Sequence, residues 1–113
     1  MHLDMSGGAA VIGAMQAIAK LKLKQNVIGI VAAAENAVSA DAMRAGDIFT
    51  AMNGKTVEVL HTDAEGRLAL ADALTYCERF KPKMIIDVAT LTGAALVALG
   101  QQASVVMTSN DEL

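Results

Sequence analysis

Apolar and polar positions along the chain fall into two patterns, helical stripes and continuous apolar runs. A stripe of apolar residues on one helical face predicts a helix over about residues 9–23, with Ser6 as its N-cap. A second stripe predicts a helix over residues 68–80, which Pro82 ends. A third, short helix is expected over residues 94–99. In the second helix, the residues expected to face inward are Leu70, Ala73, Leu74 and Cys77, and those expected to face outward are Asp72, Glu78 and Arg79.

The continuous apolar runs predict buried strands over residues 26–34, 84–89 and 105–107. Residues 48–52 and 56–60 are expected to pair as a hairpin, because Asn-Gly at positions 53 and 54 is the preferred two-residue turn. Strands that alternate with helices predict an α/β fold with a mostly parallel central sheet and helices on both faces.

Composition narrows the class of protein. The chain has 113 residues, which is room for one domain at most, and it is 54% apolar with only 19% charged residues. Average soluble domains carry about 25% charged residues. A chain this apolar is expected to be part of a larger α/β domain or an obligate oligomer. Its net charge of -3 gives no basic face, so nucleic acid is not an expected partner.

The single cysteine, Cys77, lies within an apolar helical pattern and is expected to be packed rather than reactive. The lack of a disulfide framework fits a reducing, cytoplasmic compartment. The start of the chain lacks the positive region of a secretory signal. The most apolar window, residues 84–99, is interrupted by Asp87 and is shorter than the ~18 residues of a spanning helix, so no membrane span is expected.

The segment from 61 to 72 concentrates the candidate chemistry. Asp63, Glu65 and Arg67 alternate with small residues, and in an extended loop this spacing places them on one side. Two neighbouring carboxylates favour a divalent cation between them, and the planar fork of Arg67 suits a small anion. The alternative is an ordinary turn in which Asp63 caps the next helix and Arg67 is solvated.

Two other segments are expected at the same place. Residues 1–5 are expected to be the end of a strand that arrives at Asp4, and the turn at residues 90–93 follows the run 84–89. Ligands of parallel α/β sheets bind outside the carboxyl ends of the strands, so Asp4, the 61–67 loop and the 90–93 loop are expected to share one crevice.

Three sequence blocks carry a family resemblance. They are TDAEGRL at residues 62–68, DVATLTGA at residues 87–94 and MHLDMSGGA at residues 1–9. In this order and spacing they resemble the leucyl aminopeptidase (cytosol aminopeptidase) family, and the likeness covers nearly the whole chain.

The resemblance implies two divalent ions, manganese or zinc, as cofactors. Asp4 matches a ligand of one ion, Asp63 a ligand of the other, and Glu65 a carboxylate that contacts both. Arg67 matches a catalytic arginine that positions a bicarbonate.

The resemblance also implies a substrate and an assembly. Thr90, Leu91 and Gly93 match a loop that orients the peptide backbone, and Met1 matches a residue lining the pocket for the first side chain. The implied activity is release of apolar N-terminal residues from peptides in the cytoplasm, by a hexamer.

The chain departs from the family pattern in two ways. Two lysines and a bridging aspartate that precede Asp4 in the family are absent, so residues 1–113 are expected to be a partial catalytic domain that is inactive alone. His61 replaces the usual Asn and is expected to contact its own loop rather than a metal. Two alternatives remain: a non-catalytic oligomerising or binding module with this fold, and a small-anion or nucleotide-binding domain that uses Gly7, Gly8 and Arg67.

Overall fold

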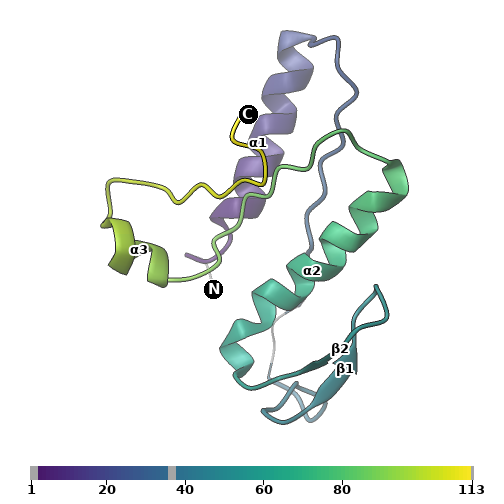
Figure 1. Cartoon of the computed structure of the whole chain (residues 1–113), viewed down its shortest axis with the longest axis vertical. Helices are drawn as coiled ribbons and strands as arrows, with labels where there is room; N and C mark the ends of the chain where they lie inside the picture. The colour runs from purple at the N-terminus through teal and green to yellow at the C-terminus, as the bar shows by residue number, and fades with distance from the viewer. Residues whose placement is uncertain (1–2, 36–37, 113) are drawn as a thin grey trace.

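The computed structural model describes residues 3–35 and 38–112. Helix α1 (Ser6–Leu21) comes first, followed by strands β1 (Ile48–Thr50) and β2 (Thr56–Glu58). A short 3₁₀ helix, η1 (Thr62–Ala64), leads into α2 (Glu65–Cys77), which continues as η2 (Glu78–Phe80), and α3 (Ala94–Leu99) lies near the end. Figure 1 shows two groups of elements, with the hairpin beside α2 and the later segments around α1.

Helix α1 confirms the first predicted helix but begins earlier than expected. The N-cap is Met5, which makes no side-chain capping bond, so Ser6 is the first helical residue and not the cap. The helix ends at Lys22, whose left-handed backbone (φ 51°) closes the last turn. Along the predicted stripe, Val11, Met15 and Ile18 are half-buried, whereas Ala19 and Lys22 are exposed.

The predicted hairpin is present, with a different turn. Strands β1 and β2 are antiparallel, and Phe49 pairs with Val57. Ala51 and Lys55 still face each other, with Ala51 N–H donating to the Lys55 carbonyl at 2.8 Å, so the loop has three residues, 52–54, instead of two. Gly54 takes φ +83°, the left-handed residue that a three-residue loop needs.

Helix α2 begins three residues before the predicted start and ends at Cys77. Leu70, Ala73, Leu74 and Cys77 are half-buried, as predicted. Asp72 was expected to face outward and is also half-buried, because it contacts the hairpin. Lys81 ends the helical region with φ 48°, directly before Pro82.

The expected parallel sheet is not formed within residues 3–35 and 38–112, where the hairpin is the one sheet present. The runs 26–34, 84–89 and 105–107 carry no strand, since a strand requires ladder hydrogen bonds to a neighbour and these segments make none. Two of them instead contact α1: Gly29 lies against Met15, and Val88 lies against Gly7. The described residues thus combine helices with one antiparallel strand pair, and the predicted parallel sheet with helices on both faces is not confirmed.

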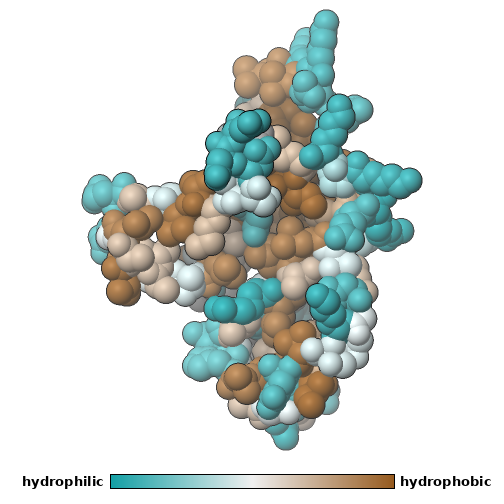
Figure 2. Space-filling view, viewed as in Figure 1, coloured by the Kyte–Doolittle hydropathy of each residue, from teal (hydrophilic) through white to brown (hydrophobic). Residues whose placement is uncertain are grey.

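Most side chains remain accessible. Among the described residues, Val59 is the one buried large apolar residue, at 3% exposure. The radius of gyration is 16.1 Å, against about 13 Å for a compact domain of ~100 residues. The accessible surface is 9896 Å², roughly 1.7 times what a compact monomer of this mass exposes. Figure 2 shows apolar residues open on the visible face.

Candidate functional site

The start of α1 is joined to the predicted substrate loop. Gly7 N–H donates to Thr90 Oγ1 at 3.0 Å, linking residues 83 positions apart. A Cβ on Gly7 would overlap the Val88 carbonyl oxygen and lie 2.8 Å from Ala89 Cα. The structure therefore brings the segment after Asp4 to the segment that begins at Thr90. Among the described residues, η1 and α2, which carry positions 62–67, make no contact with α1, so the expected crevice of three segments is met only in part.

The 61–67 segment is not an extended loop. Residues 62–64 form η1, and Glu65 is the first residue of α2. The spacing of two therefore does not place Asp63 and Glu65 on one side by strand periodicity. The reason is local capping: His61 Nδ1 accepts from Asp63 N–H at 3.2 Å, which favours a helical turn over an extended chain. This contact confirms the prediction that His61 binds within its own loop.

The charged side chains of this segment are exposed at the start of α2. Asp63, Glu65 and Arg67 are all accessible to solvent. Glu65 lies in the first helical turn, where the positive end of the helix dipole stabilises a carboxylate. The segment is therefore available to bind a ligand.

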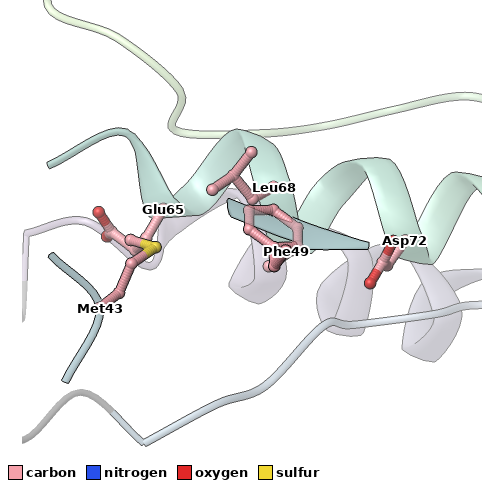
Figure 3. A pocket seen from close by; sticks show the side chains of 6 residues that line it. Met43, Phe49, Glu65, Leu68 and Asp72 are labelled. Atoms are coloured by element: carbon pink, nitrogen blue, oxygen red, sulfur yellow. The ribbon is translucent and has the colours of Figure 1, made fainter. Parts of the chain in front are cut away.

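An open hollow of ≈ 260 Å³ lies between the hairpin and α2 (Figure 3). In Figure 3, Glu65 lies beside Met43 at one end, Asp72 lies at the other, and Phe49 and Leu68 lie between them. Phe49 on β1 and Leu68 on α2 therefore line this hollow from the two elements that flank it.

Asp72 adds a polar link between the same two elements. Its Oδ1 accepts from Met52 N–H at 2.8 Å, which fixes the hairpin loop to α2. The hairpin is fixed at its base as well, because Val59 N–H donates to the Asp47 carbonyl and Gly46 N–H to the Val59 carbonyl. The entry to the 61–67 segment is thus held from both ends of the hairpin.

The donor chemistry of the predicted metal ligands fits a hard divalent cation, because Asp4, Asp63 and Glu65 offer carboxylate oxygens and are exposed. Their arrangement does not make a complete ligand set. Within the part of the chain that the structure describes, no three or more His, Cys, Asp or Glu side chains gather around one point. Each assignment therefore stays a prediction.

The predicted substrate residues are placed in part. Thr90 contacts α1 through its side chain, Leu91 is 46% exposed, and Gly93 is the N-cap of α3. Met1 lies outside the described residues. No helix in the described segments has the length and apolar character needed to cross a bilayer.

Sequence reasoning missed one contributor to this region and left the partner of another unidentified. Gly7 was expected at a tight, closely packed helix start, and the structure identifies its partner as the 88–90 backbone. Asp72 was assigned to solvent. Its position four residues after Leu68, on the half-buried face of the helix, was the available signal.

Comparison with known proteins identifies relatives along the whole chain. The family model described as the cytosol aminopeptidase family, catalytic domain, matches residues 1–113. Two curated proteins, each named "Probable cytosol aminopeptidase", are 59% identical in Syntrophotalea carbinolica and 58% identical in Legionella pneumophila. Each alignment covers 100% of this chain and 23% of the relative, so the chain spans about a quarter of the relatives' length.

A solved structure agrees with these relatives. A mutant of tomato leucine aminopeptidase superposes with a TM-score of 0.77 and 52% sequence identity. The superposition covers 86% of this chain and 19% of the tomato chain. The arrangement of segments in Figure 1 is therefore similar to that in part of the tomato leucine aminopeptidase chain.

Proposed function

The chain belongs to the cytosol aminopeptidase family, and we propose that it contributes to the catalytic domain of a metal-dependent aminopeptidase that releases N-terminal residues from peptides. The observation that carries this proposal is the match of residues 1–113 to the catalytic-domain model of that family. Relatives 58–59% identical over the same residues support it. The preference for apolar first residues is part of the proposal.

The metal site is proposed to use three carboxylates of this chain, with two divalent ions, manganese or zinc. Asp4 would hold one ion, Asp63 the other, and Glu65 would contact both. Bound divalent ions supply Lewis-acid polarisation of a peptide carbonyl. The three carboxylates are exposed and offer oxygen donors, which supports this assignment. The remaining ligands would come from other parts of the protein.

Arg67 is proposed to be the catalytic residue that holds a bicarbonate. It lies two residues after Glu65 at the start of α2 and is exposed. A guanidinium presents paired donors that match a planar anion such as bicarbonate. Bound there, the anion would accept a proton during peptide hydrolysis.

Substrate is proposed to lie along residues 90–93. Thr90, Leu91 and Gly93 would orient the peptide backbone, and Met1 would line the pocket for its first side chain. The exposure of Leu91 and the fixed position of Thr90 support this role.

The full protein is proposed to complete the fold. The extended runs 26–34, 84–89 and 105–107 would become strands of the mostly parallel sheet once neighbouring segments supply hydrogen-bond partners. Their apolar side chains are exposed on this chain, including Ile86 at 76% and Val106 at 86%. A cytoplasmic hexamer is the proposed assembly.

Glu65→Ala tests the function in the full-length protein. Because one side chain would contact both ions, we expect loss of leucine anilide hydrolysis and a lower Mn²⁺ content. Glu58→Ala is the matched control, since Glu58 is an exposed carboxylate on β2. Wild-type turnover with full metal occupancy in Glu65→Ala would refute the assignment.

A non-catalytic binding module is the second candidate. It is favoured by the finding that the described residues gather no three-ligand group. Mn²⁺ titration of the full-length protein separates the two candidates: two ions bound per chain support the peptidase, and one ion or none supports a non-catalytic module.

A further inference from the structure

We propose that the Thr90 hydroxyl is a positioning group that caps α1 from a distant segment and thereby fixes the substrate loop relative to Asp4. The inference rests on the proposed function, because it assigns a purpose to a contact between two of the proposed site segments. The hydrogen bond from Gly7 N–H to Thr90 Oγ1 and the packing around it are called the Gly7–Thr90 contact below.

Helix α1 needs an external cap. The first four N–H groups of a helix have no partner within the helix, and an N-cap side chain normally accepts from the second or third of them. Here the N-cap is Met5, which has no suitable acceptor and makes no capping bond. Gly7 is the second helical residue, and its N–H donates to Thr90 Oγ1 at 3.0 Å. Thr90 therefore does what a local Ser or Asp would do at other helices.

The packing around this bond leaves little freedom. Gly7 is buried, and any side chain there would meet the backbone of Val88 and Ala89. The helix start thus lies directly on the 88–90 backbone, and the hydroxyl sets the register between them. Every other side-chain hydrogen bond within the described residues joins positions no more than 20 apart, as in the Asp72–Met52 pair. The Gly7–Thr90 contact is therefore the polar link that joins α1 to the later segments around it.

The functional consequence follows from what flanks the contact. Asp4 lies immediately before the N-cap of α1, and Thr90 opens the loop that contains Leu91 and Gly93. A shift of the Thr90 side chain would therefore move a proposed metal ligand relative to the proposed substrate loop. The Thr90 hydroxyl is directed to α1, which leaves its backbone groups for the peptide.

The test uses Thr90→Val in the full-length protein, because valine keeps the shape of threonine and lacks the acceptor. Losing one hydrogen bond of ordinary strength corresponds to roughly a fivefold effect. We expect about that rise in KM for a leucine anilide, a similar loss of Mn²⁺ affinity, and faster hydrogen exchange at the Gly7 amide. Thr90→Ser should restore all three quantities to within about twofold.

Thr108→Val is the matched control. Thr108 lies outside the proposed site segments, and its Oγ1 accepts from Asn110 N–H at 2.9 Å, a bond confined to residues 108–110. This substitution removes the same chemical group from a local bond and should leave KM, Mn²⁺ affinity and Gly7 exchange unchanged.

Gly7→Ala provides an independent approach to the same contact. If it folds, its effect and that of Thr90→Val should be strongly non-additive in the double variant, because both break one contact. If it does not fold, the Thr90 series decides the matter alone.

Two results would overturn the proposal while leaving the proposed function intact. The first is a Thr90→Val protein with a lower melting temperature but unchanged KM and Mn²⁺ affinity, which would make the contact purely structural. The second is a Thr90→Val protein indistinguishable from Thr108→Val in KM, Mn²⁺ affinity and Gly7 exchange. A wild-type protein that neither cleaves the anilide nor binds Mn²⁺ would overturn both this proposal and the proposed function.

Discussion

At the scale of single residues, His61 shows how a substitution in a signature segment can keep its local structure. Its Nδ1 accepts from Asp63 N–H and so serves as the cap of η1. The asparagine usual at this position in the family has a side-chain oxygen that can accept the same bond. The cap requires only a side-chain acceptor for the Asp63 N–H, and the Nδ1 of His61 provides it.

The capping role predicts different effects for two substitutions of His61. His61→Asn should leave the turn intact, whereas His61→Ala should destabilise it by about 1 kcal/mol, because the Asp63 amide loses its acceptor. Hydrogen exchange at the Asp63 amide measures this, and the alanine variant should exchange roughly fivefold faster. Equal exchange in both variants would mean that the turn forms without the cap.

Arg67 belongs to the same exposed segment but is proposed to bind an anion. Arg67→Ala in the full-length protein should therefore lower the kcat for peptide hydrolysis, by about a hundredfold if the bicarbonate acts as a general base, with little change in Mn²⁺ affinity. Stimulation by added bicarbonate should disappear as well. Collapse of metal binding with stimulation retained would identify Arg67 as a structural residue instead.

In this segment, the sequence therefore predicted which residues carry the chemistry better than it predicted their arrangement in space. The sequence located Asp63, Glu65 and Arg67 in one segment, but their arrangement on an extended backbone was wrong. The capping bond of His61 and the early start of α2 decide that geometry, and both depend on side-chain orientation. A spacing of two cannot distinguish a strand from the entry to a helix.

At the scale of elements, the hairpin and α2 are joined around one open hollow. Phe49 and Leu68 line this hollow from the two elements, and Val59 is buried directly after β2. Asp72 links the two elements through Met52. The orientation of α2, and with it the position of Glu65, depends on these few contacts.

Asp72→Ala should loosen the hairpin loop without unfolding α2. The Met52 N–H would lose its acceptor, and one hydrogen bond at a half-exposed site contributes about 1 kcal/mol. We expect faster hydrogen exchange at the Met52 amide and a small decrease in the free energy of unfolding of the full-length protein.

Asp72→Asn keeps a side-chain oxygen and should be close to wild type, and Asp41→Ala is the control for losing an exposed carboxylate in a loop. An Asp72→Ala protein with unchanged Met52 exchange would show that the apolar contacts suffice.

Local elements were predicted well where the signal is local. The helices α1, α2 and α3 and the hairpin were all expected. Helices α1 and α2 begin three residues before their predicted starts, both strands end two residues early, and α3 has the predicted bounds. The three-residue loop at 52–54 differs from the expected turn because Asn53 caps Lys55 N–H at 3.0 Å while Gly54 takes the left-handed conformation. The runs 26–34 and 84–89 are different in kind. An apolar run becomes a strand only where a neighbouring strand supplies hydrogen-bond partners. The sequence of these two runs does not show whether such a neighbour is present.

At the scale of the whole molecule, the composition and the structure agree. A chain that is 54% apolar with few charges was expected to lack the polar surface of a small monomer. Exposed apolar side chains are indeed numerous, and the surface is roughly 1.7 times that of a compact monomer. A stable interface between two proteins buries about 800 Å² on each partner. The accessible surface of this chain exceeds that of a compact monomer by several times this area, so one ordinary interface would not cover the difference.

Residues 1–113 purified alone should therefore self-associate and hydrolyse a leucine anilide poorly. Exposed apolar runs with unpaired backbone groups are templates for association. The proposed carboxylates do not form a three-ligand group within the described residues, so catalysis should stay low with added Mn²⁺. Light scattering after size exclusion should give masses above the 11.7 kDa of one chain, increasing with concentration.

Ile86→Lys with Val106→Lys places charges on two exposed runs and should shift the distribution toward the monomer without raising activity. A monodisperse monomer with a sharp thermal transition would show that these apolar surfaces are compatible with an independent fold, and turnover that Glu65→Ala abolishes would show that this chain alone carries a working site.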